Sequence, residues 1–243
     1  LIPGANGSAR LLAKELGKQG VVVLRYDKLG TGKTGMPPGA FTWDDYGVEQ
    51  RAALQLLREH ANVDPNRVFV AGHSEGGAHA LRLVANGEPV AGVLLLSTAG
   101  RTLADVIVWQ IDNQLRKAGV SETEISVHHN QLTRAFADIA AGKEVDPTKA
   151  SPYPGVQQLV MGVLEPTARG FAKELLTFDP AKAFAEFDLP VLVLSGAKDI
   201  QVDPDWDATP LATASKAAGR VTTFVVSADA DHVLKHEPRP VDQ

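Results

Sequence analysis

Short, continuous runs of branched apolar residues recur along this chain, and they constrain its fold more strongly than any other feature. Three of them fall in the first hundred residues, at Val21–Leu24, Val68–Ala71 and Val93–Leu96. Such runs are typical of strands that are covered on both faces, as in a parallel sheet. Segments with helical spacing lie between them, as crossovers between parallel strands require. The alternation predicts an α/β fold with a doubly wound, mostly parallel sheet.

The helices expected between these strands have recognisable ends. The second helix is predicted to begin at a cap, Thr42 or Asp44, and the third to follow Ser74 directly and to stop before Gly87. The alternation of strand and helix returns late in the chain, with apolar runs at Val191–Leu194 and Val221–Val226 and a helical pattern between them.

The region between residues 101 and 188 contains no convincing strand pattern. Leu103, Ile107, Ile111 and Leu115 recur at four-residue spacing, and Ser121-Glu122-Thr123-Glu124 has the form of a capping box that opens another helix. The apolar spacing is too regular for a disordered linker. We therefore expect residues 1–100 and 189–243 to form the core, and residues 101–188 to form an inserted helical lid.

Composition excludes several classes of function. The chain has 243 residues, 44% of them hydrophobic, a net charge of −5 and no cysteine. The acidic balance argues against a nucleic-acid partner, and the lack of cysteine removes disulfides, thiolate metal sites and cysteine nucleophiles. No apolar run approaches the roughly 20 residues that span a bilayer. We expect a soluble protein, and the sequence sets no expectation for its compartment, cytoplasmic or secreted, or for its oligomeric state.

The motif G-x-S-x-G occurs once, at Gly72-His73-Ser74-Glu75-Gly76, between a predicted strand and a predicted helix. In a sharp strand-to-helix turn of this kind the serine hydroxyl is lifted clear of the sheet, where it can act as a nucleophile. Side chains two residues before and after the serine are expected to collide with the neighbouring strand and helix, which explains glycine at both positions. Ser74 is the candidate nucleophile.

A serine nucleophile needs a base, and the base needs a carboxylate that orients it. Where a serine follows a strand in this kind of turn, the expected chain order is serine, acid, histidine. Asp199 follows the predicted strand at Val191–Leu194, and His232 follows the strand at Val221–Val226. Carboxyl ends of parallel strands share one rim, so these three side chains are expected to meet there. Asp203 and Asp205 remain alternatives for the acid.

Other candidate ligands have simpler explanations. His236 lies four residues after His232, a spacing suited to a metal on a helix, but the glutamate of zinc proteases is absent, so we expect no metal. Asp229 and Asp231 are expected to form turns. His73 is expected to line a pocket or to be structural, and the pair His128-His129 to be polar surface or interface residues in the helical region.

Two further features bear on ligands. Gly30-Thr31-Gly32-Lys33-Thr34 imitates a phosphate-binding loop, but Asp27 stands where that motif needs glycine, so we expect a tight turn with Asp27 bonding backbone amides, and no cofactor. Acyl transfer also needs donors for the developing oxyanion. The backbone N–H of Glu75 is the first candidate, and that of Ala5 the second.

These stretches together resemble the α/β-hydrolase superfamily, in particular bacterial serine esterases related to the acyl-peptide hydrolase branch. The resemblance rests on Pro3-Gly4, on the stretch from Arg25 to Thr34, on the turn at Ser74 and on the loops of Asp199 and His232, and so spans nearly the whole chain apart from the helical region. The sequence departs from such relatives in a short loop after Gly4, which bears on Ala5, and in lacking a helix after the histidine loop.

The motifs predict a serine hydrolase that cleaves small or medium carboxylic esters through an acyl-enzyme intermediate, a carboxylesterase-like enzyme of class EC 3.1.1. The expected partner is a small-molecule acyl ester. A thioesterase or a peptidase uses the same triad. A receptor of the same fold with little turnover is a further alternative.

Overall fold

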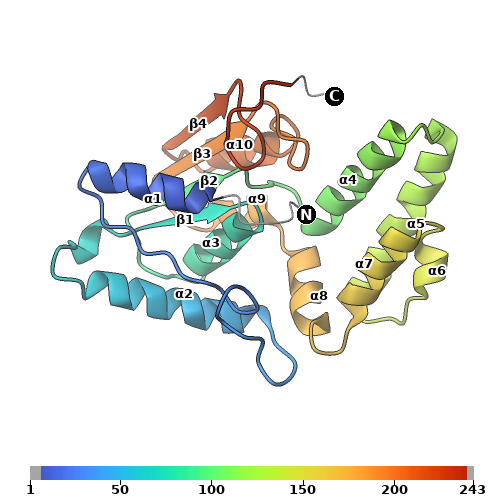
Figure 1. Cartoon of the computed structure of the whole chain (residues 1–243), viewed down its shortest axis with the longest axis horizontal. Coiled ribbons are helices and arrows are strands. Elements are labelled where there is room, and N and C mark those ends of the chain that lie inside the picture. Colours follow the sequence, from blue (N-terminus) through green and yellow to red (C-terminus); the bar gives the residue numbers. More distant parts are fainter. Residues whose placement is uncertain (1–6, 240–243) are drawn as a thin grey trace. The chain divides into compact units, whose positions relative to one another are not determined.

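Four parallel strands form one sheet in the computed structural model, which describes residues 7–239 (Figure 1). The strands are β1 (Phe69–His73), β2 (Gly92–Leu96), β3 (Val191–Gly196) and β4 (Thr222–Ser227), and they lie in the order β1-β2-β3-β4. Each neighbouring pair is parallel. The predictions of strands in these four regions and of a parallel sheet are confirmed, and all four carboxyl ends lie at one edge of the sheet.

The prediction of a strand at Val21–Leu24 is wrong. The segment has no regular secondary structure, and its four side chains are between 37% and 47% exposed. A strand exists only where its N–H and C=O groups pair with a neighbouring strand. This segment joins no strand of the described sheet, so its apolar composition alone does not make it one.

The described residues fall into two compact units, the first drawn from residues 7–36, 46–100 and 180–239 and the second from residues 37–45 and 101–179. In the first unit α3 (Glu75–Ala85) packs against β1 and β2, and α9 (Pro180–Ala185) packs against α3 and α10 (Ala208–Ala217). Leu81 of α3 and Leu95 of β2 are fully buried. The remaining elements are α1 (Ser8–Lys18), most of α2 (Trp43–Arg58) and the short 3₁₀ helix η1 (Pro65–Arg67).

The second unit is helical in the region where the sequence predicts helices. It contains α4 (Leu103–Lys117), α5 (Glu122–Ala140), α6 (Pro147–Ala150), α7 (Pro154–Leu164) and α8 (Arg169–Thr177). The capping box is present, because the Ser121 hydroxyl accepts the Glu124 N–H while the Glu124 carboxylate accepts the Ser121 N–H. Apolar residues from all five of these helices form one core, which includes Ile111, Leu132, Ala150, Val160 and Leu176.

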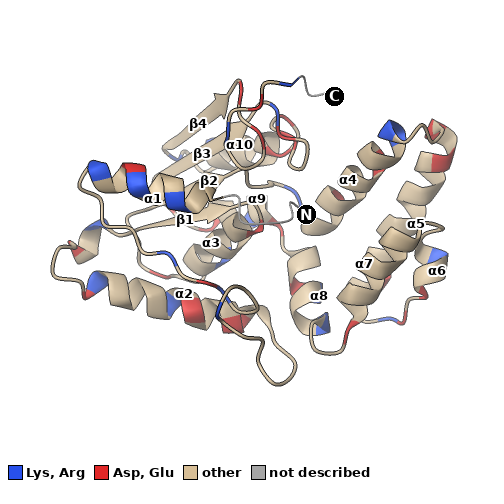
Figure 2. Ribbon diagram, in the orientation of Figure 1, with Lys and Arg blue, Asp and Glu red and all other residues tan. Residues whose placement is uncertain are grey.

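The surface carries charges of both signs. Figure 2 shows Lys and Arg interspersed with Asp and Glu along α1 and α2. One local ion pair joins Lys18 and Glu15 on α1, where Nζ lies 2.8 Å from Oε1. Among the described helices, none combines the length and apolar composition that a membrane crossing requires.

Candidate active site

The turn between β1 and α3 holds Ser74 in a strained backbone conformation. Its φ is 55° and its ψ is −124°, in a region that residues with a Cβ rarely adopt. The turn is fixed on both sides, because the Ser74 N–H donates to the Leu96 carbonyl at 2.9 Å and the Ser74 carbonyl accepts the Gly77 N–H at 2.9 Å. This is the geometry that presents a serine hydroxyl above the carboxyl edge of a sheet.

The close approaches at this turn are made by Gly72 and Gly77. A Cβ at Gly72 would lie 2.2 Å from the Gly76 carbonyl oxygen, and one at Gly77 would lie 2.0 Å from Thr98 Oγ1. A Cβ at Gly76 would meet nothing within 4 Å. The expectation of a collision is therefore confirmed at Gly72 and wrong at Gly76. The reason is that Gly77, one residue further along α3, is the helix position that lies against Thr98, just after β2.

Replacing Gly77 by alanine is expected to lower the free energy of unfolding by about 1–3 kcal/mol, since Thr98 must move to admit the methyl group. Gly76→Ala is the matched control, because the space around it is open and alanine favours a helix over glycine by about 0.5–1 kcal/mol. Urea unfolding of the two variants measures the difference. Equal stabilities would contradict the packing described here.

Asp199 and His232 are brought into direct contact. Asp199 Oδ2 lies 2.8 Å from His232 Nδ1, and the two side chains are 0% and 7% exposed. The other carboxylate oxygen of Asp199 accepts the backbone N–H groups of Gln201 and Val202 at 2.8 and 2.9 Å. With a proton on Nδ1 directed to the carboxylate, Nε2 is left as the acceptor of a neutral imidazole. This is the arrangement that a general base needs.

The loops that carry Asp199 and His232 pack backbone against backbone. The Lys198 N–H donates to the Ala230 carbonyl at 3.0 Å, and a Cβ at Gly196 would lie only 2.2 Å from that same oxygen. Asp231 Oδ1 accepts the N–H groups of Val233 and Lys235 and so stabilises the turn after His232. The expectation that Asp231 forms a turn is confirmed.

The alternative acids lie elsewhere in the loop. Asp203 Oδ1 accepts the backbone N–H groups of Asp205 and Trp206 at 2.9 and 2.8 Å. These bonds organise the turn before α10. Of the three candidate acids, Asp199 is the one whose carboxylate holds His232.

His73 links the serine turn to the histidine loop. Its Nε2 lies 2.7 Å from the His232 carbonyl oxygen, and the two imidazole rings are 4.9 Å apart. Burial lowers the pKa of His73, although the bond to the carbonyl opposes that shift. A neutral ring that donates from Nε2 fits this contact. The chain neighbour of Ser74 therefore holds the backbone of His232, which agrees with the structural alternative expected for His73, although the partner itself is not readable from the sequence.

Glu75 begins α3, so its backbone N–H lies at the helix N-terminus, where the first N–H groups lack partners within the helix. Its carboxylate is ionised at neutral pH. Burial would raise the pKa of Glu75, but the hydrogen bond from His79 and the charge of Lys28 outweigh it and lower the pKa to about 2. Ala5, the other expected donor, lies outside the described residues.

The remaining histidines have structural surroundings. His236 pairs through its backbone with Ala230 in an antiparallel bridge and is not on a helix with His232. In the second unit His129 is half-exposed and contacts Asp112, as expected of a polar surface residue. The expectation of a surface position is wrong for His128, which is 3% exposed and lies 2.8 Å from the Ser151 hydroxyl.

The Gly30–Thr34 stretch forms a turn around Asp27. Asp27 Oδ2 accepts the Lys33 N–H at 3.1 Å, and the Asp27 carbonyl accepts the Thr34 hydroxyl at 2.6 Å. A Cβ at Gly32, whose φ is +53°, would collide with the Asp27 carboxylate. A carboxylate at this point repels a phosphate, and the prediction of a tight turn held by Asp27 is confirmed.

Solved structures of other proteins share this fold. An esterase from Pyrococcus furiosus is 16% identical with a TM-score of 0.56, and the match covers 92% of this chain and 66% of that one. An esterase from Thermogutta terrifontis is 18% identical with a TM-score of 0.55, covering 96% and 80%. A bromoperoxidase from Bacillus anthracis is 17% identical with a TM-score of 0.55, covering 96% and 83%. The chain thus spans just under two thirds of the Pyrococcus esterase.

Likeness at these identities shows the fold alone, because one fold carries many chemistries. The sequence comparison goes further, since residues 1–243 match the profile of the alpha/beta hydrolase family. Together with the parallel sheet and the strained serine between β1 and α3, the match over the whole chain identifies the family. The chain belongs to the alpha/beta hydrolase family.

Proposed function

We propose that this protein is a serine hydrolase that cleaves carboxylic esters through an acyl-enzyme intermediate. The observation that carries the proposal is the 2.8 Å contact between Asp199 and His232, in a loop whose backbone is held by His73, next to Ser74. A strained serine, an acid and a base, in this order along the chain, are the parts that acyl transfer requires.

In the proposed mechanism Ser74 Oγ attacks the ester carbonyl carbon while His232 Nε2 takes the hydroxyl proton. Asp199 stabilises the imidazolium that forms. The Glu75 N–H donates to the oxyanion of the tetrahedral intermediate, with the Ala5 N–H as the second proposed donor. The intermediate collapses when His232 gives its proton to the alcohol leaving group. Water then attacks the acyl-enzyme by the same steps and releases the carboxylic acid.

Small or medium carboxylic esters are the proposed substrates. Two of the structural relatives described above are named esterases, which favours esters over other acyl donors. Thioesters and peptides remain the alternative substrates for the same three residues. A relationship to the acyl-peptide hydrolase branch is also proposed, on the motifs at Arg25–Thr34 and Ser74.

The helical unit is proposed to act as a lid that lines the acyl pocket. Trp109 of α4 is a large, half-buried apolar side chain of this unit. Trp109→Ala is expected to change the preference among p-nitrophenyl esters of increasing acyl length, while Val127→Ala on the exposed side of α5 is the control. An unchanged preference in the Trp109 variant would contradict a role of this side chain in the lid.

Burst kinetics with a series of p-nitrophenyl esters test the enzyme against the receptor alternative. We expect many turnovers per protein molecule, with activity that depends on Ser74. A single stoichiometric burst would identify a sensor with little turnover. Parallel assays with acyl thioesters and aminoacyl p-nitroanilides identify the preferred acyl donor by the largest kcat/KM.

A further inference from the structure

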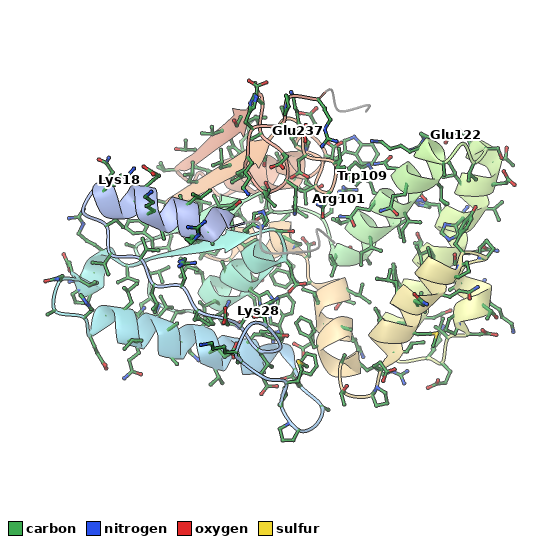
Figure 3. The ribbon with its side chains drawn as sticks, viewed as in Figure 1. Lys18, Lys28, Arg101, Trp109, Glu122 and Glu237 are labelled. Carbon is green, nitrogen blue, oxygen red and sulfur yellow. The ribbon has the colours of Figure 1, made fainter. Side chains whose placement is uncertain are left out.

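Two charged or polar side chains gather around the carboxylate of Glu75, the residue that follows Ser74. Lys28 Nζ lies 2.8 Å from Glu75 Oε1, and His79 Nε2 lies 3.2 Å from the same oxygen. Lys28 comes from the segment that joins α1 to α2 (Figure 3), whereas Glu75 and His79 are one turn apart on α3. The proposed mechanism uses only the backbone N–H of Glu75, so it leaves this cluster without a role.

The Glu75 carboxylate creates an electrostatic problem for that mechanism. Its pKa of about 2 keeps it negative at any pH at which an esterase works. It lies within one side-chain length of its own N–H, where the oxyanion is expected to form. Two negative charges this close repel each other, and the repulsion grows as the reaction proceeds from a neutral carbonyl to an oxyanion.

Lys28 supplies the compensating positive charge, and several contacts fix its position. The Lys28 carbonyl accepts both the N–H and the hydroxyl of Thr31, at 2.9 and 2.7 Å. The next residue, Leu29, donates its N–H to the Glu49 carboxylate at 2.9 Å. The ammonium group also lies 5.4 Å from the ring centre of Tyr46, within the range of a cation–π contact.

We propose that Lys28 is an electrostatic positioning residue, which holds and neutralises the Glu75 carboxylate so that the helix N-terminus can stabilise the oxyanion. The inference rests on the proposed function. It also explains why a glutamate is tolerated beside the nucleophile. An acidic residue in the first turn stabilises α3 through the helix dipole, and Lys28 offsets the repulsion between that carboxylate and the oxyanion.

The ion pair between Lys28 and Glu75 contributes little to the stability of the fold, so a structural role and the proposed electrostatic role predict different results. The side chains of Lys28 and Glu75 are 44% and 37% exposed, and ion pairs with such access to water stabilise a fold only slightly. The electrostatic effect is larger in the reaction, because substrate and serine exclude water from the site as charge develops. Loss of Lys28 should therefore lower kcat clearly while the melting temperature changes little.

A double-mutant cycle tests the proposal. Lys28→Met keeps an unbranched side chain of nearly the same length and removes its charge, and it is expected to lower kcat about tenfold with little change in KM. Adding Glu75→Gln to Lys28→Met removes the uncompensated carboxylate and is expected to raise kcat again, about fivefold. A double variant no more active than Lys28→Met would overturn the proposal, since a purely structural pair gives no such rescue.

Controls keep the test decisive. Lys18→Met with Glu15→Gln removes an ion pair of the same 2.8 Å distance on α1, labelled at Lys18 in Figure 3, and should leave kcat unchanged. If Lys28→Met does not fold, Lys28→Gln removes the charge with a polar side chain, and a wild-type kcat in that variant would equally overturn the proposal. Ser74→Ala is assayed alongside. Turnover that survives in Ser74→Ala refutes the proposed function. If Ser74→Ala is inactive but Glu75→Gln does not restore kcat to Lys28→Met, only the role of Lys28 is refuted.

Discussion

Replacement of Ser74 by alanine is expected to lower kcat for p-nitrophenyl esters by roughly 10⁵- to 10⁶-fold, the loss seen when one member of a catalytic triad is removed. The loss is this large because Ser74, His232 and Asp199 act as a unit. Alanine keeps the Cβ that strains the backbone at a φ of 55°, so the substitution should leave the stability of the protein close to that of the wild type. Initial rates and thermal unfolding measure the two effects.

Ser97→Ala is the matched control for this substitution. Ser97 is also a serine with positive φ, 46°, at the carboxyl end of a strand, and it is fully buried. Its hydroxyl has no hydrogen-bond partner among the described residues, so it has no part in the proposed mechanism. We expect the Ser97 variant to keep its activity. Equal losses in both variants would contradict a specific role of the Ser74 hydroxyl.

Asp199→Asn is expected to lower kcat by about 10⁴-fold while the protein stays folded. The amide has the shape of the carboxylate, and its oxygen can still accept the backbone N–H groups of Gln201 and Val202. Its NH₂ group then faces His232 Nδ1 and donates to it, which places the imidazole proton on Nε2. In that tautomer His232 cannot accept the proton of Ser74.

Asp203→Asn separates this effect from damage to the loop. Asp203 lies four residues from Asp199, and its carboxylate binds backbone N–H groups rather than a histidine. We expect its replacement to affect the stability of the turn before α10 and to preserve kcat. A large loss of kcat in the Asp203 variant, with retained activity in the Asp199 variant, would show that Asp203 and not Asp199 is the acid that orients His232.

Strands and helices that pair with described neighbours were predictable from local patterns. Apolar runs located β1 to β4, and the spacing from Leu103 to Leu115 located α4. The run at Val21–Leu24 has the same composition but no strand to pair with, and pairing is a property of the whole sheet rather than of the segment. The error at Gly76 has a similar origin, because the face that α3 turns toward β2 depends on how the helix packs.

The candidate site was predictable as far as chain order reveals it. The positions of Ser74, Asp199 and His232 after three strands predict that they share an edge, and the contact of Asp199 with His232 agrees with that expectation. The contacts of His73 with the His232 carbonyl and of Lys28 with Glu75 join residues 159 and 47 positions apart. No local pattern encodes such contacts, since they depend on where two loops meet.

The most direct test of the central claim is to label the protein with a fluorophosphonate and to map the adduct by peptide mass spectrometry. The probe reacts with a serine hydroxyl only where a base and an oxyanion site activate it. We predict one adduct per molecule, on Ser74, that is absent from Ser74→Ala and strongly reduced in Asp199→Asn. An adduct on another residue, or no adduct in the active wild-type protein, would contradict the assignment of Ser74 as the nucleophile.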